Sequence, residues 1–392
     1  MTPFLTRLMG RLPIGWLQLK HNRTRLLAAV GGVTFANVLI FMQLGFMNAL
    51  FETSVITHRN LVADIVLVSS DFRSLREANP LPRTRMYQAM AIPGVTEATP
   101  VFMSTMMWTD PATGDTTNFR VIGIVPSGEV FLDEKLQQQV PLLREPDSAI
   151  VDRRTRDFRR EIETVIQEQG EYLIESSGRQ LSLRGVFSHG ASFDVDGLLI
   201  VSEQTFLSLF PKRAAGTPTV VLLKCASGTD PLAIARQIDQ HFPERDVLAL
   251  TKQEFIDAEQ NYQSRQTPIG FVFGFGVAIG VIVGLVMVYQ VLSTDVQDHL
   301  AEYATLKAIG YSPRYFLGIV FEEAVCLATL GFVPGLCVSL VLYAVAARAT
   351  ALPIAMTWSR PLFVLLLTAV MCVFSGAVAT RRLNSADPAD LF

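Results

Sequence analysis

The residues whose spacing first suggests chemistry form a glycine-rich run from Gly270 to Gly284. A nucleotide-binding loop needs a preceding strand and backbone amides that are open to phosphate. This run lies instead inside an uncharged apolar stretch, where burying a phosphate would be very costly. Glycines spaced by four clear one helix face for close packing, against a neighbouring span or a second subunit. The residues predicted to pack in this way are Gly276, Gly280 and Gly284, together with Ala28, Gly32 and Ala36 in the first apolar stretch.

Titratable side chains give weaker signals. Glu322 and Glu323 are the acids inside an apolar span, and such acids are functional candidates by default. They lie near one end of that span, so contact with water or with Arg314 is the simpler interpretation and proton coupling the alternative. Five arginines between Arg153 and Arg160 alternate with acids, which favours a solvated, self-paired helix face over docking of an acidic partner. The five histidines lack ligand spacing, so we expect no catalytic residues and no metal site.

The polar segment from Asp295 to Arg314 lies between two apolar stretches. Residues that fall at helical spacing within it are Leu300, Tyr303, Ala304, Leu306 and Lys307. Gly310 follows where a helix-terminating glycine would stand. A short amphipathic helix between two spans is a surface on which a partner can dock. Because neither a Walker A sequence nor an ABC signature occurs in the chain, we expect the partner to be a separate ATPase.

Composition indicates a membrane protein with one large water-exposed domain. Of the 392 residues, 50% are hydrophobic and 18% are charged, and the mean hydropathy is +0.34. The net charge of -3 excludes a broad basic surface, so we expect no nucleic-acid partner. The four cysteines form neither a disulfide framework nor a zinc-binding pattern.

Four segments are long and apolar enough to cross a bilayer as helices, which takes about 20 residues. They are residues 26–51, 267–294, 315–347 and 361–380. Positive charges precede the first and follow the fourth, at Arg7, Arg11, Lys20, Arg23, Arg25, Arg381 and Arg382. By the positive-inside bias, both termini are therefore expected in the cytoplasm and residues 52–266 outside, in the periplasm if the cell has two membranes. The expected location of this multi-pass protein is then the cell inner (cytoplasmic) membrane.

This orientation assigns every other segment to one side of the membrane. Residues 1–25 are expected to form a cytoplasmic N-terminal interfacial helix, or else a plain extension of the first span. The remaining assignments are a periplasmic domain at 52–266, a cytoplasmic coupling helix at 295–314, a periplasmic loop at 348–360 and a cytoplasmic tail at 381–392.

The periplasmic domain shows short strands and polar helices. We predict an α+β part from 61–125 and 217–250, an inserted β-rich part at 126–216, and a helical stalk at 52–60 and 251–266. The predicted fold class is thus an α-helical membrane protein with four transmembrane helices plus a large α+β extracytoplasmic domain between helices 1 and 2.

Several motifs resemble the permease family that includes MacB, LolC/LolE and FtsX, and most closely its DevC-type members from cyanobacterial glycolipid exporters. The residues that carry the resemblance are Thr267–Phe271, Val288–Leu292, Asp295–Leu300, Glu302–Tyr311, Trp16–Lys20 and Ala386–Phe392. The Asp295–Tyr311 block is the specific part, whereas the periplasmic domain matches only in general pattern.

The resemblance implies the MacB-like permease fold and a homodimer that exports a glycolipid or another amphiphile. It also implies an ABC ATPase subunit, a periplasmic membrane-fusion adaptor and a TolC-like outer-membrane channel as partners, besides membrane lipids. The chain itself would bind no cofactor, because ATP and Mg are used by the partner ATPase. The residues that the ATPase would hold are Glu302, Thr305, Leu306, Lys307 and Gly310.

Two other functions remain open from the sequence. The first is an FtsX-like membrane regulator that activates a periplasmic cell-wall hydrolase and exports nothing. The second is a membrane enzyme with an extracytoplasmic active site, for which no motif is present.

Overall fold

The computed structural model describes residues 14–110, 113–176, 178–190, 192, 194–242, 244, 246–299, 302, 305, 309–350 and 352–385. The chain divides into two compact units. The membrane unit comprises residues 1–48, 271–346 and 354–392, and the sheet unit comprises residues 49–270 and 347–353.

Four long helices meet the length and hydropathy requirements for membrane spans, as predicted. They are α3 (Arg23–Asn60), α10 (Pro268–Asp298), α12 (Pro313–Thr350) and α13 (Ser359–Ser385). The short helix α2 (Ile14–His21) precedes them. Asn22 separates α2 from α3, and its side-chain oxygen accepts the Arg25 N–H at 3.2 Å as a helix cap does. The protein is therefore a multi-pass membrane protein.

Small residues let α3 and α10 approach closely within the membrane unit. A Cβ added at Gly280 would lie 2.8 Å from Ile40, and one at Gly284 would lie 3.3 Å from the Cβ of Ala36. Further pairs are Gly276 with Gln43 and Gly32 with Met287. Residue numbers run in opposite directions along the two helices, so they pack antiparallel.

One residue of the predicted packing stripe does not pack within this chain. Ala28 is exposed, whereas Ala29 is buried in the apolar core of the unit. The buried face of α3 contains Ala29, Val33 and Ala36, which are three or four residues apart as expected for one face of a helix. A stripe drawn at a constant interval of four residues does not stay on this face.

The sheet unit contains one nine-stranded mixed sheet of order β5-β6-β4-β7-β3-β2-β8-β1-β9. Its strands are β1 (Ile65–Ser69), β2 (Val95–Thr109), β3 (Thr116–Ile124), β4 (Ser148–Asp152), β5 (Tyr172–Ser176), β6 (Arg179–Phe187), β7 (Gly197–Ser202), β8 (Val220–Cys225) and β9 (Val247–Thr251). Strands β1 and β7 are nearly continuous apolar runs, as expected where both sheet faces are covered.

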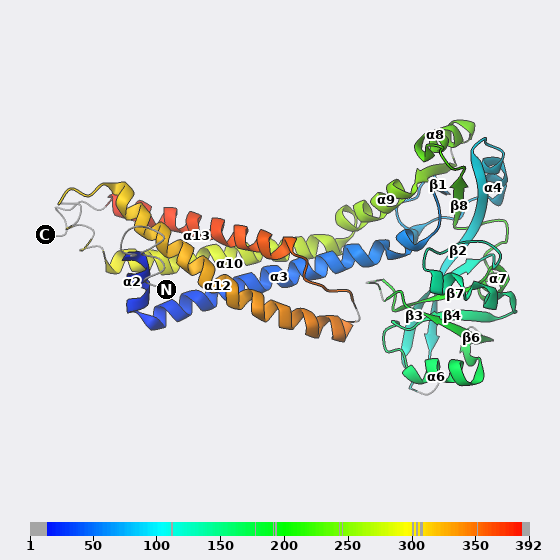
Figure 1. Ribbon diagram of the computed structural model, residues 1–392, viewed down its shortest axis with the longest axis horizontal. Coiled ribbons are helices and arrows are strands. Elements are labelled where there is room, and N and C mark those ends of the chain that lie inside the picture. The colour runs from blue at the N-terminus through cyan, green and yellow to red at the C-terminus, as the bar shows by residue number, and fades with distance from the viewer. Residues whose placement is uncertain are drawn as a thin grey trace. The chain divides into compact units, whose positions relative to one another are not determined.

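Helices cover the sheet at both ends. Helices α4 (Arg83–Met90) and α8 (Pro231–His241) lie beside β2 and β9, and α6 (Arg160–Gln169) lies beside β5 and β6 at the opposite end (Figure 1). The remaining helices of the unit are α5 (Glu134–Gln137), α7 (Glu203–Leu209), α9 (Lys252–Arg265) and the two 3-10 turns η1 (Leu75–Glu77) and η2 (Val140–Arg144).

The two parts predicted for the periplasmic domain share this single sheet. Strands β4 to β7 come from residues 126–216, and β7 pairs in parallel with β3 of the flanking part. Phe119 pairs with Gly197 and Ile124 with Ser202 in this register. The predicted boundary therefore runs between two hydrogen-bonded strands.

The predicted stalk segments are helical. Residues 52–60 continue α3 without a break, and α9 covers most of 251–266. Helix α9 begins with a capping box in which Thr251 and Glu254 each accept a backbone hydrogen bond from the other. It ends at Arg265, and Pro268 opens α10.

Candidate functional site

The polar segment between α10 and α12 contains described residues in helical conformation and, after them, a glycine turn. Glu302 and Thr305 are helical, and the Ile309 N–H donates to the Thr305 carbonyl oxygen at 3.1 Å. Gly310 has a φ of +105°, the left-handed conformation that glycine adopts after a helix. Leu306 and Lys307 lie outside the residues that the structure describes.

Several described side chains of this segment are open to a partner. Glu302 and Thr305 are exposed, as are Ile309 (71%) and Tyr311 (44%). An isoleucine and a tyrosine exposed side by side in a polar segment are the kind of apolar anchors that protein interfaces bury. The segment can therefore dock a partner through apolar contact with a polar rim.

Arg25 links the start of α3 to the end of α10, just before this segment. Its guanidinium lies 2.5 Å from Asp298 and 3.8 Å from Asp295. The His299 N–H also donates to the Asp295 carbonyl oxygen at 3.2 Å, which continues the helix past Asp298. Sequence reasoning used Arg25 only for orientation and missed this ion pair. The available signal was opposite charge flanking two spans on the same predicted side.

Glu322 and Glu323 are buried, and the expected contact with water is wrong. Their exposed fractions are 1% and 0% because α2 covers them. The Trp16 backbone N–H donates to Glu322 Oε1 at 3.3 Å. A Cβ at Gly15 would lie 2.8 Å from the Ile319 carbonyl oxygen and 2.9 Å from Glu323, so only glycine permits this approach of α2 to α12.

The apolar face of α2 is covered by protein. Trp16 and Leu19 are buried in the same core as Leu292, Val320 and Leu327. The interfacial helix predicted for residues 1–25 therefore packs this face on the membrane unit over its described part, residues 14–21. Residues 1–13 lie outside the described chain.

In the sheet unit, a buried joint connects the end of α3 to α9. His58 Nε2 lies 3.2 Å from Glu259 Oε2, and both side chains are buried. The same carboxylate accepts the Leu75 N–H at 2.9 Å and the Gln263 side-chain amide at 3.1 Å. The His58 ring also packs on Phe255 at 4.4 Å. The two hydrogen-bond donors to Glu259 thus come from η1 and α9, while His58 joins α3 to α9 through its ring contact with Phe255 and its proximity to Glu259.

Two further contacts fasten this joint. Lys252 donates to the Leu61 carbonyl oxygen at 2.9 Å, and burial lowers the pKa of Lys252 against the opposing effect of Asp64. Thr57 Oγ1 lies 3.1 Å from His189 Nε2, which connects α3 to the loop after β6. Burial lowers the pKa of His189 most, Arg120 lowers it further, and the Asp152 and Asp133 carboxylates oppose the shift.

Within the described residues, no group of three or more His, Cys, Asp or Glu side chains could hold a metal ion. The two features that stand out are the exposed segment between α10 and α12 and the buried joint between α3 and α9.

The FtsX-like permease C-terminal family matches residues 272–388. Among solved structures, the periplasmic region of MacB from Actinobacillus actinomycetemcomitans is similar, with 11% identity and a TM-score of 0.33 over 52% of this chain and 95% of that one. The extracellular domain of the noncanonic ABC-type transporter YknZ from Gram-positive bacteria gives 14% identity and a TM-score of 0.34 over 48% and 99%. A search of curated proteins gives no match. The match to the FtsX-like permease C-terminal family is confined to residues 272–388, a region that holds most of α10, the segment between α10 and α12, α12 and α13.

Proposed function

We propose that this chain is the permease subunit of an ABC-type exporter and that a separate ATPase docks on the segment between α10 and α12. The observation that carries the proposal is the exposed Ile309 beside the helix end and the Gly310 turn, inside an FtsX-like domain. ATP and Mg would be bound by the partner.

The ion pairs of Arg25 give this docking site a mechanical role. Because Arg25 of α3 binds Asp298 at the end of α10, displacement of the docked segment pulls on both helices at once. A helix is stiff, since its backbone hydrogen bonds are satisfied within it. We infer that α3 and α9 pass the displacement to the sheet unit through the joint at His58 and Glu259.

The wider assembly follows from the same proposal. The chain works as a homodimer in the cell inner membrane with cytoplasmic termini, and the sheet unit faces the periplasm. There it engages a membrane-fusion adaptor and a TolC-like channel, and the cargo is a glycolipid or another amphiphile.

The test is the substitution Ile309→Asp in the full chain, purified with its ABC ATPase. A charge at the centre of an apolar contact should weaken the complex at least tenfold and abolish stimulation of ATP hydrolysis by the permease. Pull-down of the ATPase and its hydrolysis rate measure the two effects.

The matched control is Met107→Asp, because Met107 in β2 is equally exposed, at 71%. This variant should bind the ATPase like the wild type. Unchanged binding by Ile309→Asp would overturn the docking proposal. Capture of a cell-wall hydrolase instead of an adaptor would favour the regulatory function over export.

A further inference from the structure

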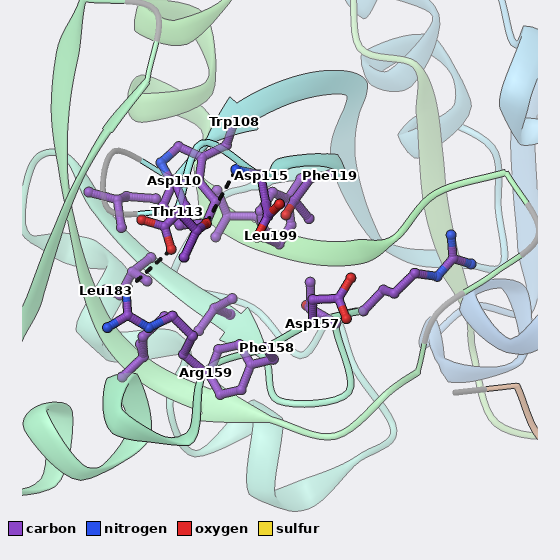
Figure 2. Close-up of a pocket in the computed structure, with 16 residues that line it drawn as sticks. Trp108, Asp110, Thr113, Asp115, Phe119, Asp157, Phe158, Arg159, Leu183 and Leu199 are labelled. Atoms are coloured by element: carbon purple, nitrogen blue, oxygen red, sulfur yellow. Dashed lines mark hydrogen bonds and ion pairs between the residues drawn. The ribbon is translucent and has the colours of Figure 1, made fainter. Parts of the chain in front are cut away.

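A cavity of about 70 Å³ lies in the sheet unit beneath the tip of the β2–β3 hairpin (Figure 2). Its deep wall is apolar and rigid, since Val151, Leu183 and Leu199 are almost completely buried. Trp108 and Phe119 close it from the side of β2 and β3. These residues belong to the core between the sheet and α6, so the floor of the cavity is packed core. Its mouth is formed by loop residues, among them Asp110, Asp115 and Asp157.

One polar atom in the wall has no partner. Trp108 Nε1 is buried, and it makes no hydrogen bond with any residue that the structure describes. An unsatisfied buried donor costs about 1–3 kcal/mol, so native proteins rarely keep one without a use. The Trp108 ring lines the cavity, so an acceptor that enters the cavity can reach this donor.

Acidic and basic side chains line the mouth of the cavity, and an ion pair and close packing fix their positions. Arg159 lies 3.3 Å from Asp110 across the mouth, and Asp157 beside it has a φ of +59°, which is rare outside glycine. Thr155 packs so closely on Gly197 that a Cβ there would lie 2.2 Å from its hydroxyl. The charged lining residues are Asp110, Asp115, Asp157, Arg156 and Arg159. Both arginines are paired with carboxylates, so an anionic group meets no unpaired arginine at this rim, and a neutral polar group fits it better. Strained backbone of this kind concentrates at binding sites.

The size of the cavity limits what enters it. An engineered cavity of about 150 Å³ binds benzene, and this one has about half that volume. It accommodates the end of a branched alkyl chain, not a sugar or a fused ring system. The rest of a ligand would lie at the mouth, beside Asp110 and Arg159.

We propose that this cavity binds the apolar end of a small neutral amphiphile, a branched-chain ketone, ester or amide, whose carbonyl oxygen accepts the Trp108 Nε1 hydrogen. The site lies in the sheet unit, apart from the segment that docks the ATPase. The binding proposal can therefore fail without affecting the proposed export function, and the reverse is also true.

The test uses the full chain in lipid nanodiscs, because detergents are themselves amphiphiles. In a Trp16→Phe, Trp358→Phe background Trp108 is the sole tryptophan, and its emission is followed during titration with 4-methyl-2-pentanone. We expect a saturable change in emission. The hydrocarbon of the same shape, 2-methylpentane, should bind about tenfold more weakly because it offers no acceptor.

Two variants complete the test. Ile174→Phe fills the cavity and should weaken ketone binding at least tenfold, whereas Met107→Phe, at an exposed position outside it, should leave binding unchanged. Trp108→Phe, followed by the rise in melting temperature that the ketone produces, should reduce the affinity for the ketone to that for the hydrocarbon. If Ile174→Phe does not fold, the affinity of Trp108→Phe for the ketone tests the proposal. Non-saturable emission, equal affinity for both probes, or undiminished binding by a folded Ile174→Phe would each overturn the proposal.

Discussion

At the scale of residues, buried polar groups hold the structure at the points where helices meet. Glu322 binds the backbone of α2 at Trp16, and Glu259 binds the backbone of η1 at Leu75. Removing one partner of such a buried pair is costly, because a charge or a donor is left without compensation. These residues were difficult to identify in advance, because their partners lie about 306 and 184 residues away in the chain.

His189 gives a pH dependence whose sign can be worked out. Burial lowers its pKa in the folded protein below the ordinary value of about 6.5. Between the lowered value and about pH 6.5, the unfolded chain binds more protons than the folded one, so stability falls as the pH falls through this window. The slope contributed by His189 is at most about 1.4 kcal/mol per pH unit.

The measurement is the free energy of unfolding of the sheet unit in the full chain, between pH 7.5 and 5. His189→Gln should flatten the slope, while His241→Gln, on the exposed end of α8, should leave it as in the wild type. An unchanged slope in His189→Gln would show that the buried pair of Thr57 and His189 does not govern acid stability.

At the scale of elements, uninterrupted apolar runs were sufficient to predict the four spans, and glycine was sufficient to predict the turn at Gly310. Most strands were also predictable from apolar runs between turns. Strand β4, Ser148–Asp152, is difficult to predict, because five residues between a polar turn and a charged stretch give little periodicity. The single sheet could not be predicted, because the β3–β7 pairing joins residues about 80 positions apart and depends on tertiary packing.

The close contact between α3 and α10 should make the membrane unit sensitive to a larger side chain at Gly280. Gly280→Leu places a side chain where Ile40 already lies 2.8 Å from the Cβ position, and it should destabilise the membrane unit by about 1–3 kcal/mol. Gly274→Leu is the matched control, because nothing lies within 4 Å of its Cβ position and leucine favours a helix. Thermal unfolding in nanodiscs compares them. Equal melting temperatures would argue against a tight α3–α10 contact.

At the scale of the whole molecule, helix α3 contributes residues to both units. Residues 23–48 belong to the membrane unit and residues 49–60 to the sheet unit, without an interruption of the helix. Such continuity is what a lever requires, and it was suggested by a polar stretch after the first span that lacks glycine and proline. The proposed cargo and adaptor rest on the family resemblance, because no sequence motif in the sheet unit identifies either one.

The central claim is that the segment between α10 and α12 faces the cytoplasm, where an ATPase can hold it. The direct measurement is labelling of Thr305→Cys in intact cells with a thiol reagent that does not cross the inner membrane, in a Cys225→Ser background. Met107→Cys serves as the outer control. We expect Met107→Cys to be labelled once the reagent enters the periplasm, and Thr305→Cys to be labelled only after the inner membrane is opened. Labelling of Thr305→Cys with the inner membrane intact would contradict it.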